Sequence, residues 1–224
     1  MSLLLIVVAI VSLSSAQDPA GSWLTYAKAQ VPGVMLKFFY AEATVPPYPT
    51  LPGSSAAWWI GVEDQVTQNV TGSCQCDLRQ PIMIKHGFGY SSFVERYDWY
   101  TGEDYQSSAI TVKPGQKVFG LLQLQPNGKD YLMSSGIVNT SSVVSYVIQS
   151  DANDGVSSIA WIVLEHQPSL CAQLPPSNGI LFDNITAVWV DGSTAPWTAH
   201  THAPACGSAT KVLSQQKVAM VWQS

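Results

Sequence analysis

The chain has 224 residues, of which 46% are hydrophobic and only 11% charged, and its formal net charge is −5. This length fits one domain with ample apolar material for a core, and the low charged share is typical of a secreted protein. No basic run occurs, so nucleic-acid binding is not expected, because neutralising phosphates requires clustered Lys and Arg.

The N-terminus carries an apolar run from Leu3 to Leu13, followed by the small residues Ser14-Ser15-Ala16. This pattern predicts a secretory signal peptide over residues 1–16 and a single domain over residues 17–224. The run is too short to span a bilayer as a helix. If it were retained, it would make a β-strand suited to insertion into a neighbouring subunit's sheet, so self-assembly through the N-terminal strand is kept as an alternative.

Short runs of β-branched and aromatic residues, separated by Gly, Pro, Asn and Ser, dominate the rest of the chain. No window of a dozen residues shows an apolar stripe at helical spacing. Roughly ten to twelve short strands predict an all-β fold, a two-sheet antiparallel β-sandwich. Residues 191–207 are expected to be irregular. The predicted strands are Leu36 to Val45, Ala56 to Val62, Ile82 to Tyr90, Phe93 to Tyr100, Ala109 to Val112, Lys117 to Leu124, Val143 to Gln149, Ser158 to Glu165, Ile180 to Val190 and Lys211 to Trp222.

The third and fourth of these strands form a predicted hairpin with its turn at residues 89–92. The fourth strand alternates regularly, so its side chains divide between two faces of the sheet. Charged and aromatic residues occur on both faces, as in a solvated sheet or a binding cleft. One face carries Phe93, Glu95, Tyr97 and Trp99, and the other carries Val94, Arg96, Asp98 and Tyr100.

Four cysteines favour disulfide bonds in a secreted chain, and four allow three pairings. Cys74 and Cys76 are too close in sequence to bridge comfortably across a strand, so we expect each to pair elsewhere, or Cys171 to pair with Cys206. A zinc site is a weaker alternative, because the usual ligand spacing is missing. No metal or other cofactor is predicted. The ligands of that alternative would be Cys74, Cys76, His200 and His202.

Three sequons, at Asn69, Asn139 and Asn184, predict N-linked glycans on the protein surface. Together with the signal-peptide pattern, they indicate a secreted, extracellular glycoprotein.

Four runs, in order, resemble the glutamic peptidase (eqolisin) family of secreted acid peptidases. The resemblance covers about residues 41–188 and implies a concanavalin-like, or lectin-like, sandwich of two antiparallel sheets. In that family a Gln and a Glu lie side by side on a concave sheet, where the Glu acts as general acid and base on a water and the Gln amide helps to stabilise the oxyanion. The runs are Ala57 to Asp64 (similar to AWVGIDG), Tyr97 to Tyr100 (WYEWYP), Ile110 to Val118 (strand, Gly turn, strand) and Ala160 to Val163 (AEWIVE).

The family's catalytic Gln has two candidate positions in this chain. Alignment on the glycine that follows it places Lys85 there, whereas alignment on the distance to Asp98 places Gln80 there. Pro81 follows Gln80, and a proline inside a strand removes a ladder hydrogen bond.

The family's catalytic Glu falls on Ala160, and the second family Glu falls on Leu164. Glu165 is one residue further along, so on a regular strand it faces the opposite side. The resemblance therefore implies the family's fold without its catalytic pair.

We expect a non-catalytic extracellular binding or structural glycoprotein with a peptide or carbohydrate ligand. Trp58 and Trp59 are adjacent on a strand and must face opposite ways, which suggests a binding surface on the outer side of the sheet. The expected binding face consists of Trp59, Lys85, Asp98 and Trp99.

Two alternatives remain. One is an acid endopeptidase that uses Gln80 or Lys85 with Glu165. The other is a subunit of an extracellular filament, assembled head to tail by β-strand insertion of residues 3–13.

Overall fold

The computed structural model describes residues 21–53, 55–65, 77–99, 101–150, 155–165, 170–203 and 205–224. The predicted signal segment, Cys74, Cys76 and the sequon at Asn69 lie outside these residues. Within the described part of the chain, no helix has the length and apolar character needed to cross a membrane.

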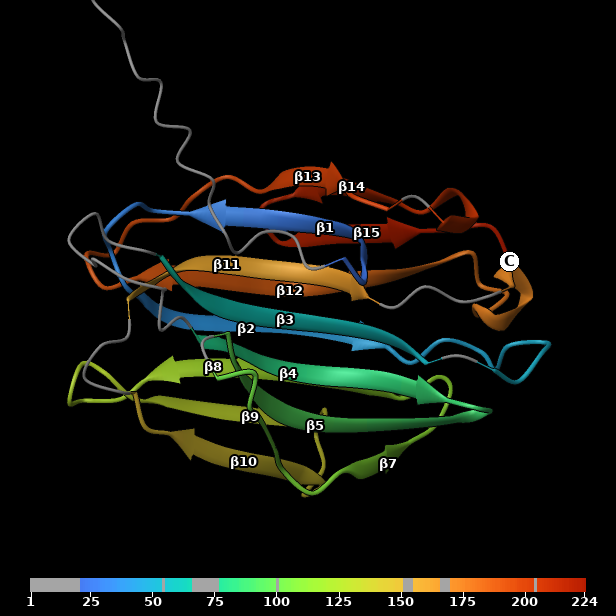
Figure 1. The fold of residues 1–224 in the computed structure, drawn as a ribbon, viewed down its shortest axis with the longest axis horizontal. Helices are drawn as coiled ribbons and strands as arrows, with labels where there is room; N and C mark the ends of the chain where they lie inside the picture. Colours follow the sequence, from blue (N-terminus) through green and yellow to red (C-terminus); the bar gives the residue numbers. More distant parts are fainter. Residues whose placement is uncertain are drawn as a thin grey trace, which may run out of the picture.

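Two antiparallel sheets pack face to face, which confirms the predicted β-sandwich. Figure 1 shows β1, β11, β3, β4 and β5 side by side in one layer. The eight-stranded sheet has the order β13 (Thr198–Thr201), β1 (Trp23–Gln30), β11 (Val156–Glu165), β3 (Ala56–Gln65), β4 (Asp77–His86), β5 (Gly89–Asp98) and β6 (Asp104–Gln106), with β7 (Ile110–Val112) also paired to β5. The seven-stranded sheet has the order β10 (Val143–Ile148), β9 (Tyr131–Ile137), β8 (Lys117–Leu124), β2 (Leu36–Thr44), β12 (Gly179–Trp189), β15 (Lys217–Val221) and β14 (Ala209–Ser214).

Most predicted strands are present with similar bounds, but the prediction missed four strands and merged two. β1, β6, β9 and β13 were not predicted, and β13 lies within the stretch expected to be irregular. The predicted strand from Lys211 to Trp222 is two strands, β14 and β15, separated by a turn at residues 215–216. β1 (WLTYAKAQ) contains Ala, Lys and Gln, residues with weak strand preference, so its sequence pattern is faint.

The turn between β4 and β5 differs from the predicted one. It consists of Gly87 and Phe88, so residues 89–92 belong to β5. Gly87 has a φ of +56°, a left-handed conformation that glycine adopts without steric cost. This two-residue turn sets the register of the hairpin and places Gln80 directly opposite Glu95.

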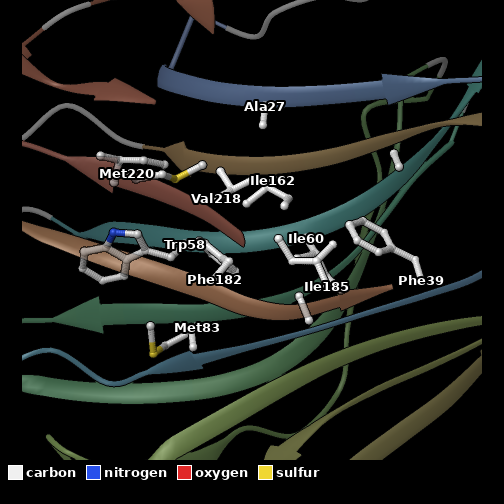
Figure 2. Packing of buried hydrophobic residues seen from close by; sticks show 14 of the residues in the cluster. Ala27, Phe39, Trp58, Ile60, Met83, Ile162, Phe182, Ile185, Val218 and Met220 are labelled. Atoms are coloured by element: carbon white, nitrogen blue, oxygen red, sulfur yellow. The ribbon is translucent and has the colours of Figure 1, made fainter. Parts of the chain in front are cut away.

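The main hydrophobic core fills the space between the two sheets (Figure 2). Trp58 and Ile60 of β3 point into it and meet Phe182 of β12 and Met220 of β15. Trp59, the neighbour of Trp58, belongs instead to a second cluster on the outer face of the eight-stranded sheet. The two tryptophans therefore face opposite ways, as predicted.

A disulfide joins Cys171 and Cys206, one of the predicted pairings. It links two short 3-10 helices, η1 (Cys171–Gln173) and η2 (Ala205–Gly207), which are 35 residues apart in sequence. The bridge holds together two connections that lie outside the sheets.

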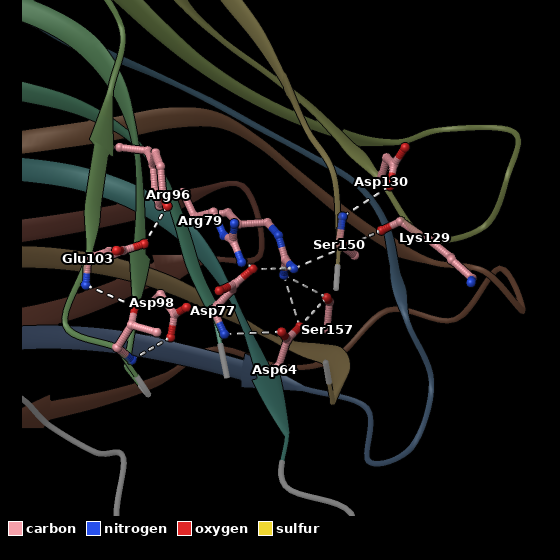
Figure 3. Close-up of polar contacts among 12 residues, drawn as sticks. Asp64, Asp77, Arg79, Arg96, Asp98, Glu103, Lys129, Asp130, Ser150 and Ser157 are labelled. Atoms are coloured by element: carbon pink, nitrogen blue, oxygen red, sulfur yellow. Dashed lines mark hydrogen bonds and ion pairs between the residues drawn. The ribbon is translucent and has the colours of Figure 1, made fainter. Parts of the chain in front are cut away.

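A buried ionic network lies at one end of the eight-stranded sheet (Figure 3). The fully buried Arg79 guanidinium donates to Asp64 at 3.0 Å and to Asp77 at 2.9 Å. Arg96 reaches Asp77 at 2.7 Å. Burial raises the pKa of Asp77, against the opposing effect of the two guanidinium groups. Arg79 also packs 5.4 Å from the Tyr131 ring centroid, so the network connects the two sheets.

Candidate functional site

Aromatic side chains cover the outer face of the eight-stranded sheet. Trp23 lies edge-on to Trp59 at 5.0 Å and to Trp161 at 5.2 Å between ring centroids, and all three are nearly fully buried. Tyr97 and Trp99 make a similar edge-on pair at 4.8 Å at the β5 end. We call this layer the outer aromatic face, formed by Trp23, Tyr26, Trp59, Tyr97, Trp99 and Trp161.

Two buried indole N–H groups of this face donate to carboxylates. Trp59 Nε1 donates to Glu165 Oε2 at 2.7 Å, and Trp161 Nε1 donates to Glu63 Oε2 at 2.9 Å. Glu165 Oε1 also accepts a hydrogen bond from Ser22 Oγ at 2.8 Å. The rings therefore fix the positions of acidic groups on an otherwise apolar surface.

Gln80 and Glu95 form a direct pair on this face. Gln80 Nε2 donates to Glu95 Oε1 at 2.5 Å, and Gln106 Nε2 donates to Glu95 Oε2 at 2.7 Å. Burial, with smaller contributions from the carboxyl groups of Asp104 and Glu165, raises the pKa of Glu95 to about 7, against the lowering effect of the hydrogen bonds from Gln80 and Gln106. Gln80 is only 4% exposed, and its Oε1 has no hydrogen-bond partner among the described residues.

Two adjoining hollows open over this pair. One has a volume of about 250 Å³ and is lined by Gln80, Trp99 and their neighbours. The other has a volume of about 580 Å³ and extends along β4 and β5. Both are lined by Glu95, Tyr97 and Glu165, so we treat them as one cleft. No Lys or Arg occurs among the described residues that line it.

Trp59 and Trp99 of the expected binding face lie on the outer aromatic face, but Lys85 and Asp98 do not. Lys85 and Met83 are two residues apart on β4, so their side chains lie on the same face of the sheet. Met83 belongs to the core between the sheets. Lys85 is fully buried there, and burial lowers its pKa. Asp98 accepts a hydrogen bond from the Thr101 backbone N–H at 3.0 Å and so holds the turn after β5.

Gln80 and Glu165, one of the expected catalytic pairs, both line the smaller hollow, but no hydrogen bond joins them among the described residues. The Gln80 amide contacts Glu95, and the described partners of Glu165 are the side chains of Ser22 and Trp59. Lys85 lies on the opposite face of the sheet from both, which contradicts its expected place in the site.

On β11, the two positions matched to the family's Glu residues and the neighbouring Glu165 lie on opposite faces. Ala160 and Leu164, where the family's two Glu residues were placed, point into the core between the sheets. Trp161 and Val163 point outward, and Glu165 faces the same way, hydrogen-bonded to Trp59. A shift of one residue along a strand exchanges its two faces, so residue matching on this strand depends on its exact register.

Sequence reasoning placed Glu95 on the correct face with Tyr97 and Trp99 but gave it no role. The missing signal was the position of the hairpin turn, because a turn at Gly87 pairs Gln80 with Glu95.

The other predicted site residues that the structure describes are not among the residues lining the cleft. His200 is stacked on Tyr26 at 4.9 Å between ring centroids. The sequon residues Asn139 and Asn184 are both exposed. Asn184 Nδ2 donates to Glu42 Oε2 at 2.9 Å.

Comparisons with solved structures identify the fold. Scytalido-glutamic peptidase bound to a transition state analog inhibitor has a TM-score of 0.63 and 14% identity, over 90% of this chain and 98% of that one. SCP-B, a member of the eqolisin family in complex with the tripeptide Ala-Ile-His, has a TM-score of 0.58 and 13% identity, over 89% and 98%. Aspergilloglutamic peptidase from Aspergillus niger has a TM-score of 0.50 and 15% identity, over 75% and 98%.

The chain therefore has a glutamic-peptidase-like β-sandwich fold. No protein-family model matches the sequence, and no curated protein is significantly similar to it. At this level of identity the similarity concerns the fold, and the chemistry of the cleft has to be argued from its own residues.

Proposed function

We propose that this protein is a non-catalytic, secreted glycoprotein that binds peptide segments in the cleft. The observation that carries the proposal is a hollow lined by the outer aromatic face, in which the buried Gln80 carbonyl oxygen has no partner among the described residues. A buried acceptor without a donor is costly, and a peptide supplies N–H donors to satisfy it. Tyr97 and Trp99 supply the rigid aromatic surface that binding sites favour.

The similar structures support this choice of ligand, because one holds the tripeptide Ala-Ile-His and another a transition state analog inhibitor. Secretion is supported by the signal-peptide pattern and by the Cys171–Cys206 disulfide, a bond that persists in oxidising compartments. N-linked glycans are assigned to the exposed Asn139 and Asn184.

Binding is tested on an array of acetylated, amidated hexapeptides with one fixed residue and degenerate neighbours. We expect Trp99→Ala to reduce the signal strongly, because aromatic anchors carry much of the energy of such interfaces. The matched control is Tyr146→Ala, which removes a 56% exposed ring from β10 in the other sheet. Equal signals from both variants, or binding of an oligosaccharide array in place of peptides, would refute the proposal.

Secretion and processing are tested by expressing the full chain in eukaryotic cells and measuring the intact mass of the secreted product. We expect a chain that begins at Gln17 and loses mass on enzymatic removal of N-glycans. A product that begins at Met1 and forms polymers would support the filament alternative instead.

The Gln80–Glu95 contact favours a second candidate function, the hydrolysis of peptide bonds. A carboxyl group with a pKa of about 7 is suited to general acid–base work near neutral pH. The test is cleavage of a denatured protein between pH 4 and 8 by the wild type, Glu95→Gln and the control Glu103→Gln, which changes an exposed residue outside the cleft lining. Cleavage lost only in Glu95→Gln would replace the binding proposal with a peptidase.

A further inference from the structure

We propose that the cleft selects peptides through a lysine side chain, whose ammonium group contacts Gln80 Oε1 and the carboxyl groups of Glu95 and Glu165. This inference rests on the peptide binding proposed above and specifies its chemistry. It is carried by the hydrogen-bonding capacity, the charge and the aromatic lining of the cleft.

The polar atoms around the cleft are mainly acceptors. Within the described part of the chain, Gln80 Oε1 is buried and has no donor, and each carboxylate oxygen of Glu95 and Glu165 accepts one side-chain hydrogen bond. A carboxylate oxygen has room for a second donor. A lysine ammonium carries three donors and no acceptor, so it matches this set better than a hydroxyl or an amide does.

The carboxyl groups of the lining are its permanent charges at pH 8; its one described histidine, His86, is the last residue of β4 and is hydrogen-bonded to Ser55 Oγ. Glu95, Glu165 and Asp104 contribute carboxyl groups, and the described lining contains no Lys or Arg. Arg96 lies on the other face of β5, where it is paired with Asp77. A low-dielectric cleft lined by one sign of charge concentrates ions of the opposite sign.

The aromatic lining suits the rest of the lysine side chain. Its methylene groups pack on rings while the charged end reaches polar partners, and an ammonium is attracted to the face of an indole. The outer aromatic face already contains one such contact, since Lys28 Nζ lies 4.9 Å from the Trp161 ring centroid, outside the cleft lining. We expect lysine in place of arginine because Gln80 Oε1 is a single acceptor atom. It suits the compact charge of an ammonium group better than a planar guanidinium with paired donors.

Ammonium binding is coupled to the protonation of Glu95. The groups that face Glu95 are Gln80 from β4, Asp104 and Gln106 from β6, and Glu165 from β11. A bound cation favours the ionised carboxylate, so binding releases a proton while Glu95 is still partly protonated. Affinity for a lysine peptide therefore rises between pH 5 and pH 8.

The test uses the full chain and three acetylated, amidated peptides that differ only at one position: lysine, norleucine or glutamate. The flanking residues come from the best sequence on the hexapeptide array. We expect the lysine peptide to bind about tenfold or more tightly than the norleucine peptide at pH 8, as one hydrogen-bonded charge pair provides. At pH 5 this ratio shrinks. Titration calorimetry at pH 7 in two buffers of different ionisation enthalpy should show proton release for the lysine peptide only.

Glu95→Gln and Glu165→Gln are compared with Glu103→Gln, after circular dichroism has shown that each variant is folded. Loss of the lysine preference in the first two, and its retention in the third, supports the inference. Equal binding of lysine and norleucine peptides, or a preference for glutamate or arginine, overturns the inference and leaves peptide binding intact. Failure of the array to bind at all overturns both.

Discussion

The raised pKa of Glu95 makes a quantitative prediction about stability. The folded protein holds the Glu95 proton with a pKa of about 7, against an ordinary value of 4.5. Each pKa unit corresponds to about 1.4 kcal/mol, so this group contributes about 3 kcal/mol of stability below pH 4.5 relative to above pH 7. The contribution is lost as pH rises through that window, because the unfolded chain ionises first.

Urea unfolding of the wild type and of Glu95→Gln between pH 4 and pH 8 measures this contribution. The variant has no proton to lose at this position. The contributions of the other titrating groups are common to both proteins, so they cancel when one free energy of unfolding is subtracted from the other. We expect the wild type to lose about 3 kcal/mol relative to the variant over this range. A difference that stays constant with pH would show that Glu95 titrates normally, and the burial argument would be wrong.

Three further substitutions test the framework around the cleft. Arg79→Ala leaves the buried Asp64 carboxylate without its cation and Asp77 with Arg96 alone, and should lower the free energy of unfolding by about 3–5 kcal/mol in urea; a loss under about 1 kcal/mol would mean that water replaces the guanidinium. Replacing Cys171 and Cys206 by serine removes the disulfide between residues that are 35 positions apart, and should lower the free energy of unfolding by about 4 kcal/mol. An unchanged thermal midpoint would contradict this. Gly61→Ala would place a Cβ 2.9 Å from the Trp59 ring and should cost about 1–3 kcal/mol, unless Trp59 fluorescence shows that the ring moves aside freely.

The fold could be predicted from the sequence because alternation and turn residues are local signals. β3, β8 and β11 are runs of β-branched and aromatic residues whose ends are marked by Gly, Pro, Asn or Ser. Alternation also predicted correctly that Trp58 and Trp59 face opposite layers.

The site could be predicted only in part, because it depends on register. A turn at residues 89–92 would pair Gln80 with Thr101, whereas the observed turn at Gly87 pairs it with Glu95. A shift of a few residues in one turn thus hid the central pair of the cleft. The same rule of alternation would have separated Lys85 from Gln80 among the candidate catalytic residues and Asp98 from Trp99 on the expected binding face.

Binding and hydrolysis make different demands on the Gln80 amide. With Glu95 ionised, the amide nitrogen donates to the carboxylate, and the carbonyl oxygen has no partner from the residues that the structure describes. A carbonyl oxygen accepts hydrogen bonds from an ammonium but cannot stabilise an oxyanion, which needs donors.

Protonation of Glu95 changes this arrangement. A protonated carboxyl group is itself a donor, so the Gln80 amide gains a favourable contact if it turns over and accepts that proton with Oε1. Nε2 would then face the cleft as a donor suited to an oxyanion. Because the pKa of Glu95 is about 7, the two states exchange near neutral pH. Peptide binding and peptide cleavage therefore have to be measured on the same protein at pH 5 and pH 8. Lysine-selective binding at pH 8 without cleavage at pH 5 would identify a binding protein, and cleavage confined to pH 5 would identify the amide as a pH-dependent catalytic group.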